Sequence, residues 1–401
     1  MALVDFVAAV AFPATARGLR MTGRQKIEAA LSQTGTPEIP AVICYEGISN
    51  RDHWDQLTSC PWWYIHDPDI DHQMEWRRDY ITKTGQDWFY LPLFYSREER
   101  ENLSIEVGPD GVFLADRRTA ERNRLEKPTV GGWPPSGEVA SYRPARPADS
   151  PEEIDAAVPL PPDSEITSLT SDGRADLAWR MLEEFGERLY PIQHAIGPLW
   201  GCYDLWGFEG MMTMVASRPD LVEYACRRIL ARQVQVVRRV AAAGAAGIWI
   251  EECMTDMVSP AAFARLNVPF LRELVQEIRT GGMKSIYYYC GNPWDRWDLF
   301  LDVGADALAF EEGKKGFRID IEEVVERVSG RCTVLGNLDA VAFLGAASEK
   351  ELRREIARQI AAGRRNASRF IMSIGSPVTP ATPVERVRLY CDIVHELGLS
   401  K

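Results

Sequence analysis

Short apolar runs and helical segments alternate regularly along the chain, and this alternation constrains the fold more than any other feature. The runs read as strands and lie near residues 41, 88, 191, 247, 285, 307, 332 and 370. Helical patterns long enough to serve as parallel crossovers separate the later runs. Strands that alternate with helices in this way form parallel sheets, and eight of them predict a (β/α)8 TIM barrel. A doubly wound open sheet is the alternative, but no G-x-G-x-x-G follows the first strand, which weakens a dinucleotide-binding version.

The barrel pattern is predicted to form a single domain over residues 21–398, and one internal segment departs from it. Alternating apolar residues flank Gly108-Pro-Asp-Gly111, which is typical of a β-hairpin. Residues 126–165 are rich in Pro, Gly and Ser and have little periodicity. We therefore interpret 100–165 as an insertion that serves as a lid or a partner surface. Residues 1–20 are predicted to be a disordered extension.

The charge and the cysteines limit the classes of function. The formal net charge is −12, which argues against binding to nucleic acid or to an anionic membrane. No apolar run approaches the ~20 residues that a membrane-spanning helix needs. The eight cysteines are scattered without a C-x-x-C pair, as expected for free thiols in a reducing compartment. The expected location is cytoplasmic.

Polar and acidic residues gather directly after the predicted strands, where a TIM barrel places its active site. A carboxyl group beside a buried strand loses solvation, which raises its pKa and suits it to act as a general acid or a metal ligand. For any single carboxylate, capping of a helix or pairing with an arginine is the more common role, but for the set as a whole it is the less common one. The predicted catalytic residues are Glu251, Glu252, Glu312 and Tyr289. The predicted substrate-binding residues are His194, Asn292, Asn337, Asp339 and Ser376.

Four stretches carry a resemblance to a known family. They are Gly244–Ile250, Tyr288–Asn292, Leu335–Asp339, and Met372–Pro377 together with Thr382–Pro383. In this order they resemble the uroporphyrinogen decarboxylase superfamily, most closely its corrinoid-linked methyltransferase branch. The resemblance covers about 21–398 and is weakest over 100–165. It implies a TIM barrel that transfers a methyl group between a small molecule and a corrinoid, usually carried by a partner protein.

The same resemblance bears on zinc. In that branch a zinc ion typically activates a thiol and is held by a His-x-Cys on strand five and a Cys after strand eight. Cys290 matches the family cysteine, and Glu312 aligns with an acidic residue that is a ligand in some relatives. Tyr288 and Ser376 stand where the other two ligands are expected. Cys290 and Glu312 are thus the candidate metal ligands, and the broken pattern leaves zinc binding open.

Three functions follow as alternatives. In methyl transfer, Glu251, Glu252 or Glu312 would protonate the leaving oxygen or nitrogen. A metal-independent decarboxylase is the second alternative, with Arg51 or another arginine as the anchor of a substrate carboxylate. Because residues 40–51 hold one arginine and also Glu46, its substrate would be a smaller acid than a porphyrinogen with many carboxylates. The third alternative is a non-catalytic barrel that binds a ligand.

Overall fold

The computed structural model describes residues 20–132, 147–162, 164–313 and 316–399. The predicted N-terminal extension lies outside this part of the chain, except for its last residue, and so does part of the predicted insertion. Within the described residues, no helix has both the length and the apolar character needed to cross a bilayer.

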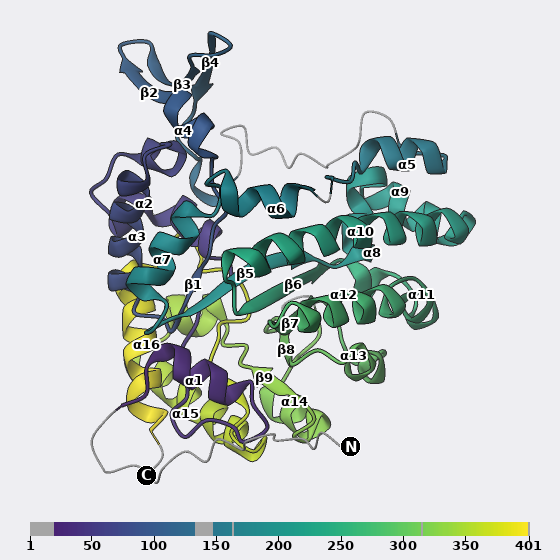
Figure 1. The fold of residues 1–401 in the computed structure, drawn as a ribbon. Coiled ribbons are helices and arrows are strands. Elements are labelled where there is room, and N and C mark those ends of the chain that lie inside the picture. Colours follow the sequence, from purple (N-terminus) through teal and green to yellow (C-terminus); the bar gives the residue numbers. More distant parts are fainter. Residues whose placement is uncertain (1–19, 133–146, 163, 314–315, 400–401) are drawn as a thin grey trace, which may run out of the picture.

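A curled parallel sheet forms the centre of the molecule, and within the described part of the chain it has seven strands (Figure 1). Their order in space is the same as their order in the sequence. The strands are β1 (Trp88–Tyr90), β5 (Tyr190–Ile196), β6 (Gly247–Cys253), β7 (Lys284–Cys290), β8 (Ala307–Phe310), β9 (Thr333–Leu335) and β10 (Phe370–Ile371). Seven of the eight predicted strands are therefore confirmed as regular strands, and the (β/α)8 class is confirmed.

The eighth position, between β10 and β1, is filled by residues 39–43. On one side Val42 N donates to Met372 O at 2.9 Å, and on the other side Asp87 N donates to Ala41 O at 2.8 Å. The segment forms only an isolated parallel bridge, Ala41 to Met372. Regular pairing stops because the Asp87 carboxylate takes the N–H of Ala41 and the Gln86 amide oxygen takes that of the residue two further on. Side chains thus complete the closure of the barrel.

Helices cover the outside of the sheet (Figure 1). Before β5 they are α1 (Gly23–Ala30), α2 (Glu46–Leu57), η1 (Trp62–His66), α3 (Ile70–Thr84), α4 (Arg97–Asn102), η2 (Val130–Gly132), α5 (Pro151–Ala157), α6 (Ser164–Ser171) and α7 (Asp176–Phe185). After β5 they are α8 (Pro198–Gly201), α9 (Tyr203–Ser217), α10 (Pro219–Ala243), η3 (Thr255–Met257), α11 (Pro260–Leu266), α12 (Val268–Thr280), α13 (Trp297–Val303), α14 (Ile321–Val328), η4 (Ala340–Ala346), α15 (Glu349–Arg365) and α16 (Val384–Leu397).

The predicted hairpin is part of a small antiparallel sheet that projects from the barrel (Figure 1). It comprises β2 (Leu103–Gly108), β3 (Gly111–Asp116) and β4 (Glu121–Leu125), in that order. Gly108 pairs with Gly111 across the predicted turn. The third strand was not predicted, because its sequence Glu-Arg-Asn-Arg-Leu has almost no apolar residue and its burial is correspondingly slight.

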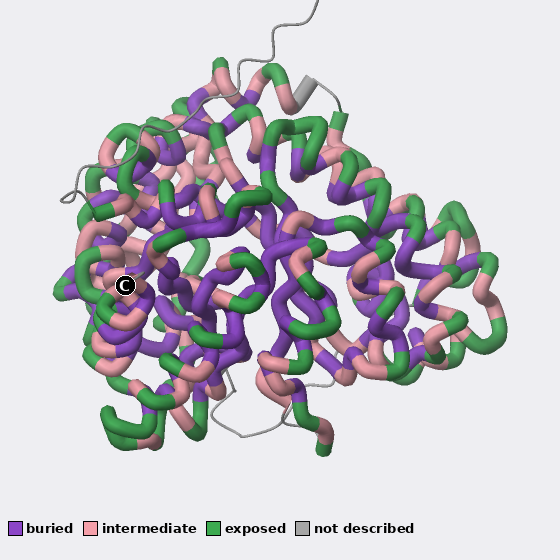
Figure 2. Tube along the Cα trace, turned by 90° about the horizontal axis from the view of Figure 1, so that it is seen from below, coloured by how far each residue is buried: buried purple, intermediate pink, exposed green. Residues whose placement is uncertain are grey.

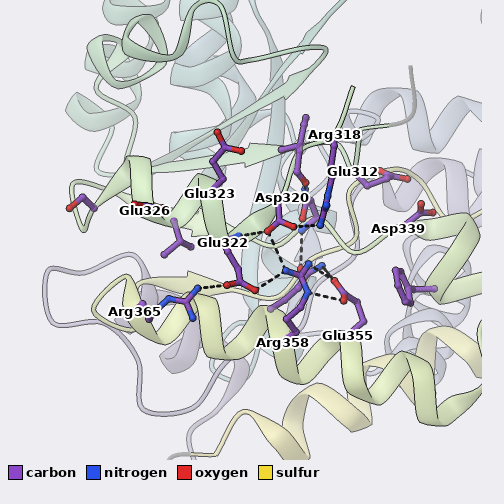
Figure 3. A pocket seen from close by; sticks show the side chains of 16 residues that line it. Glu312, Arg318, Asp320, Glu322, Glu323, Glu326, Asp339, Glu355, Arg358 and Arg365 are labelled. Carbon is purple, nitrogen blue, oxygen red and sulfur yellow. Dashed lines mark hydrogen bonds and ion pairs between the residues drawn. The ribbon is translucent and has the colours of Figure 1, made fainter. Parts of the chain in front are cut away.

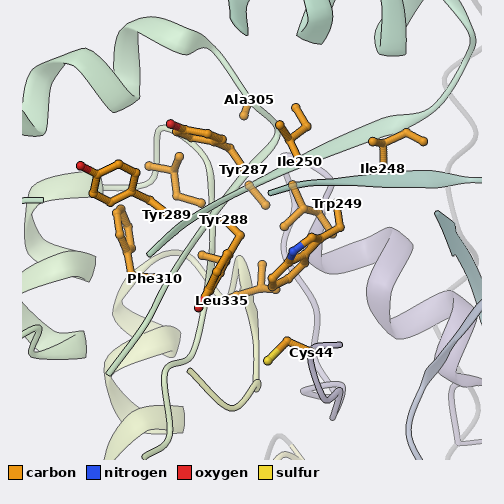
Figure 4. Close-up of a cluster of buried hydrophobic side chains, with 14 of the residues drawn as sticks. Cys44, Ile248, Trp249, Ile250, Tyr287, Tyr288, Tyr289, Ala305, Phe310 and Leu335 are labelled. Atoms are coloured by element: carbon orange, nitrogen blue, oxygen red, sulfur yellow. The ribbon is translucent and has the colours of Figure 1, made fainter. Parts of the chain in front are cut away.

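Buried residues are concentrated along the strands and in the segments nearest to them, as the trace coloured by burial shows from below (Figure 2), and their apolar side chains form one large core cluster. Successive residues of a strand point to opposite faces of the sheet. In β7, Tyr288 therefore faces the barrel interior, where its ring stacks on that of Trp249 at 4.9 Å. Tyr287 and Tyr289 point away from Tyr288 and Trp249 (Figure 4), and their rings contact that of Phe300 on α13. This alternation decides which predicted residues can meet at one site.

Candidate active site

A cavity of about 430 Å³ lies where β1, β5 and the closing segment 39–43 end. That volume suits a small molecule. Its walls include Tyr45, Glu46, Trp76, Arg77, Tyr90 and His194. These side chains come from α2, α3, β1 and β5 and from the residue just before α2. The carboxyl ends of the strands are where TIM barrels place their active sites, so this cavity is the candidate active site.

Tyr45 links the cavity to the barrel interior. Its backbone has the left-handed φ of 59°, which costs energy for a residue with a side chain and is typical of functional sites. Its ring meets those of His194, Trp249 and Tyr288 edge to face, at centroid distances of 5.7–6.1 Å. Burial lowers the pKa of His194 to about 4, so its imidazole is neutral at neutral pH. The predicted binding residue His194 thus lies in the wall of the cavity.

Two charged residues of the cavity were not predicted as site residues. Burial raises the pKa of Glu46 to about 7, although the Tyr90 N–H and the charge of Arg77 oppose the rise. Arg77 is buried with its guanidinium 4.0 Å from the centre of the Trp76 ring. Burial lowers the pKa of Arg77 to about 10, so it remains a cation at neutral pH. Nothing in the sequence distinguishes Arg77 from Arg78, the next residue, which is an ordinary surface residue paired with Glu184.

The adjacent acids Glu251 and Glu252 lie on opposite faces of β6. The prediction that both follow the strand was wrong, because β6 continues to Cys253. Glu251 faces the interior, where burial raises the pKa of its carboxyl and a hydrogen bond with Tyr45 partly offsets the rise. Glu252 points outward and is fully buried, with Oε2 accepting from Asn267 Nδ2 at 2.8 Å and from the Tyr287 hydroxyl at 3.4 Å. The outward direction separates Glu252 from the cavity.

The position of Asn267 also explains a helix break. The helical segment from Pro260 to Thr280 divides into α11 and α12 at Asn267. The backbone of Asn267 has φ −124° and ψ −54°, outside the helical region, while its side chain donates to Glu252. A buried carboxyl group needs such a partner.

The burial of the Glu252 carboxyl can be tested through the pH dependence of stability. Burial raises its pKa to about 7 from its ordinary value of 4.5, so the folded state holds a proton that the unfolded state releases at lower pH. The stability that this proton provides is complete below about pH 4.5 and is lost as the pH rises to about 7. Between about pH 5 and pH 8.5 the wild type is expected to lose roughly 2–3 kcal/mol that Glu252→Gln retains. Urea unfolding at both pH values measures the difference, and equal pH dependence in the two proteins would contradict it.

Tyr289 does not reach the cavity either. Its ring packs outward against Phe300 at 4.6 Å and Phe263 at 6.0 Å. β7 ends at Cys290, and the next residue, Gly291, has a φ of 155°, where an added Cβ would lie 2.5 Å from the Asp256 carboxyl carbon. The predicted residue Asn292 accepts from Trp294 N at 3.2 Å in the loop that follows. The structure therefore does not bring Tyr289 together with His194 and Glu251.

Two thiols stand side by side at the ends of β6 and β7. Cys253 and Cys290 are register partners, and the Cys290 thiol contacts Glu311 Oε2 at 3.3 Å. The hydrogen bond with Cys290 and burial both raise the pKa of Cys253, so this thiol stays protonated at neutral pH. None of the eight cysteines, all of which are described, forms a disulfide.

The ligand set expected for zinc is not present. Within the described ranges, no group of three or more His, Cys, Asp and Glu side chains could hold a metal ion. The Tyr288 hydroxyl donates to Gly375 O at 2.9 Å, and the Ser376 hydroxyl donates to Glu312 Oε2 at 2.6 Å. Tyr288 and Ser376, which stand where the other two ligands were expected, thus make hydrogen bonds within the protein. The side chains around Cys290 and Glu312 therefore do not fit the expected zinc site.

The remaining predicted residues line a second, larger cavity of about 1,050 Å³ beside α14 and α15. Glu312, Asn337 and Asp339 lie in its wall. Asn337 Nδ2 donates to Ile319 O at 2.9 Å, and Asp339 caps η4. The cations of this cavity are paired: Figure 3 shows Arg358 between three carboxylates, Asp320, Glu322 and Glu355, at 2.8–3.2 Å. Of the predicted residues, His194 therefore lines the first cavity, Glu312, Asn337 and Asp339 line the second, and the others line neither of the two.

Arg51, the predicted anchor for a substrate carboxylate, is also paired. Its Nε and Nη2 donate to the two carboxylate oxygens of Asp52 at 2.7 and 3.0 Å. The cation that lies at the cavity is Arg77.

The fold and this cavity define a parallel (β/α)8 barrel with a polar site at the carboxyl ends of its strands. The sequence model of the uroporphyrinogen decarboxylase family matches residues 142–397. The chain belongs to this family.

Relatives agree with this assignment, and one solved structure shares the fold. Uroporphyrinogen decarboxylase of Solibacter usitatus is 27% identical over 249 residues, which cover 57% of this chain and 69% of the relative. The enzyme of Anaeromyxobacter sp. is 25% identical over 189 residues, 47% of this chain and 52% of the relative. The chain thus spans about half of that relative. The solved methyltransferase from Methanosarcina mazei shares the fold, with a TM-score of 0.65 and 18% identity over 94% of this chain and 99% of that structure.

Proposed function

We propose that the protein is an enzyme that moves a methyl group between a small molecule and a corrinoid bound to a partner protein. The observation that carries the proposal is the charge of the cavity. Arg77 is the only arginine or lysine among the described residues that line it. A porphyrinogen with many carboxylates needs several cations. The methyltransferase from Methanosarcina mazei, which shares the whole fold, supports methyl transfer as the alternative.

The corrinoid would supply the electron pair that takes up the methyl group. In the demethylating direction the bond between the methyl carbon and an oxygen or nitrogen breaks, and that atom keeps the bonding electrons and takes a proton. Glu251 is the proposed proton source, because burial raises its pKa toward the range where a carboxyl holds a proton. Tyr45, which bonds Glu251 and lines the cavity, would pass the proton to the leaving atom.

The size of the cavity indicates that this protein would bind the substrate while a partner protein binds the corrinoid. About 430 Å³ accommodates a metabolite but not a corrinoid. The corrinoid would therefore meet the substrate at the opening of the cavity while it remains bound to its partner protein.

Decarboxylation of a small acid is the second candidate, and the buried cation Arg77 favours it. Its candidate anchor Arg51 is paired with Asp52 instead, so Arg77 is the one cation among the described residues that line the cavity. Methyl transfer therefore has the better support.

The test incubates the purified protein with reduced free cobalamin and a panel of small methyl ethers and N-methyl compounds. Chromatography with mass detection follows the demethylated products, and a parallel incubation contains uroporphyrinogen. We expect at least one demethylated product and unchanged uroporphyrinogen. Loss of carboxyl groups from uroporphyrinogen, or release of carbon dioxide from a small acid without loss of methyl, would overturn the proposal.

A further inference from the structure

The guanidinium of Arg77 is buried but only partly used. The side chain is 9% exposed and comes from the middle of α3. Nη1 donates to Gln73 O at 3.0 Å and to the side chain of the same residue, and one face of the guanidinium lies over Trp76. Nε and Nη2 make no hydrogen bond with any described residue, and they are not among the polar atoms sealed inside the protein. Since Arg77 lines the cavity, this edge is open to a ligand.

A carboxyl group shares the cavity with this cation without binding it. Glu46 and Arg77 each shift the pKa of the other through their charges, yet the two side chains, both described, form no ion pair. Glu46 Oε2 instead accepts from Tyr90 N at 3.2 Å. A gap therefore remains between a cation and an acid that face the same cavity.

Two further polar groups of the wall lack partners. Trp76 Nε1, a donor, and Asn50 Oδ1, an acceptor, are buried without a hydrogen bond. Asn50 is 5% exposed and Trp76 is 4% exposed, and both line the cavity. Buried polar atoms without a protein partner are rare and call for a ligand or water.

We propose that Arg77, Glu46 and Trp76 form a subsite for one carboxylate, which is held between the open edge of Arg77 and the carboxyl of Glu46 and receives a third hydrogen bond from Trp76 Nε1. The substrate class is then small acids with a single carboxylate. This deepens the proposed function, and it rests on that function only in treating the cavity as the substrate site.

The charge on Glu46 makes binding depend on pH. Below about pH 7 its carboxyl is protonated and donates to the bound carboxylate; above that pH two like charges meet. The other groups that face Glu46 are Arg77, which stays cationic, and Tyr80, Tyr90 and His194, which stay neutral near pH 7. The affinity of the wild type for a carboxylate is therefore expected to fall as the pH rises above 7. Glu46→Gln is expected to bind the carboxylate equally well below and above pH 7.

The test titrates acetate, lactate and benzoate, and the corresponding amides, into the purified full-length protein by calorimetry. We expect at least one carboxylate to bind and its amide not to bind. Arg77→Met is expected to weaken that carboxylate roughly 10- to 100-fold, since it removes charge-assisted hydrogen bonds. Arg78→Met is the matched control, because Arg78 is the next residue of α3 and pairs with Glu184 away from the cavity. It should bind as the wild type does.

Trp76→Phe keeps an aromatic ring under Arg77 and removes the indole N–H, so a several-fold loss tests the subsite even if Arg77→Met fails to fold. No binding by any carboxylate, equal binding of acids and amides, or unchanged affinity in folded Arg77→Met would overturn the subsite. Carboxylate binding without any methyl transfer would overturn the proposed function and leave the subsite intact. Methyl transfer that Arg77→Met leaves unchanged would overturn the subsite alone.

Discussion

Replacing Glu251 with glutamine is expected to lower turnover roughly 10²- to 10⁴-fold, the usual contribution of a positioned general acid. The glutamine side chain would keep the shape of the native one and a hydrogen bond with Tyr45 but would carry no transferable proton. Binding of a carboxylate in the cavity should be unchanged, because Arg77 and Glu46 come from other elements. Turnover and binding are measured separately, the first with substrate and corrinoid and the second by calorimetry.

Glu252→Gln is the matched control for this prediction. The two residues are adjacent in β6 and carry the same functional group, but Glu252 points away from the barrel interior and bonds Asn267. The control should change stability with pH and leave turnover within a few-fold of the wild type. Equal losses of turnover in the two variants would show that the direction of the side chains does not decide the chemistry.

Replacing Asp87 with alanine is expected to have the largest effect on stability. Its carboxylate accepts from His395 Nε2 at 2.7 Å, from Lys26 Nζ at 3.2 Å and from Ala41 N at 2.7 Å. It thereby joins α1, α16 and β1 to the segment that closes the barrel. Removing one partner from a buried ion pair leaves the other charge uncompensated, at a cost of about 3–5 kcal/mol. Urea unfolding at pH 7 measures the loss.

The pH dependence of this loss has a definite sign. Burial opposes ionisation of Asp87, but the hydrogen bond and charge of His395 and the charge of Lys26 outweigh it and hold the pKa of Asp87 below its ordinary value of 3.8. The stabilisation is present above about pH 4 and is lost as the pH falls through the lower pKa of the folded state. The difference in the free energy of unfolding between the wild type and Asp87→Ala should therefore become smaller at acid pH. Asp392→Ala, which removes an exposed pair with Arg388, is the control and should cost less than about 1 kcal/mol.

The order of the elements could be predicted from the sequence, since the alternation of strands and helices depends on local periodicity. The closure of the barrel could not. Residues 39–43 read as a strand, but the partner of Ala41 N–H is the side chain of Asp87, 46 positions further along the chain. Such a bond depends on how distant segments meet, which no local pattern encodes.

The candidate site was only partly predictable for the same reason. His194 and Glu251 were predicted from their positions at strand ends and lie at or beside the cavity. Glu252 looked equivalent because the sequence suggests that β6 ends before the acids. The strand continues to Cys253 in register with β7, and Oε2 of the buried carboxyl accepts from Asn267 and Tyr287, 15 and 35 residues away. Arg77 was missed because nothing in α3 marks one arginine of an adjacent pair as buried.

Isotope tracing on one small acid tests methyl transfer most directly. The acid carries different isotopic labels in its methyl carbon and its carboxyl carbon, and both labels are followed during incubation with the protein and reduced corrinoid. Methyl transfer predicts that the methyl label leaves while the carboxyl label stays in the product, and that Glu251→Gln suppresses the loss of the methyl label. Release of the carboxyl label as carbon dioxide would identify a decarboxylase and contradict methyl transfer. Retention of both labels by an acid that binds in the cavity would identify a barrel that only binds its ligand.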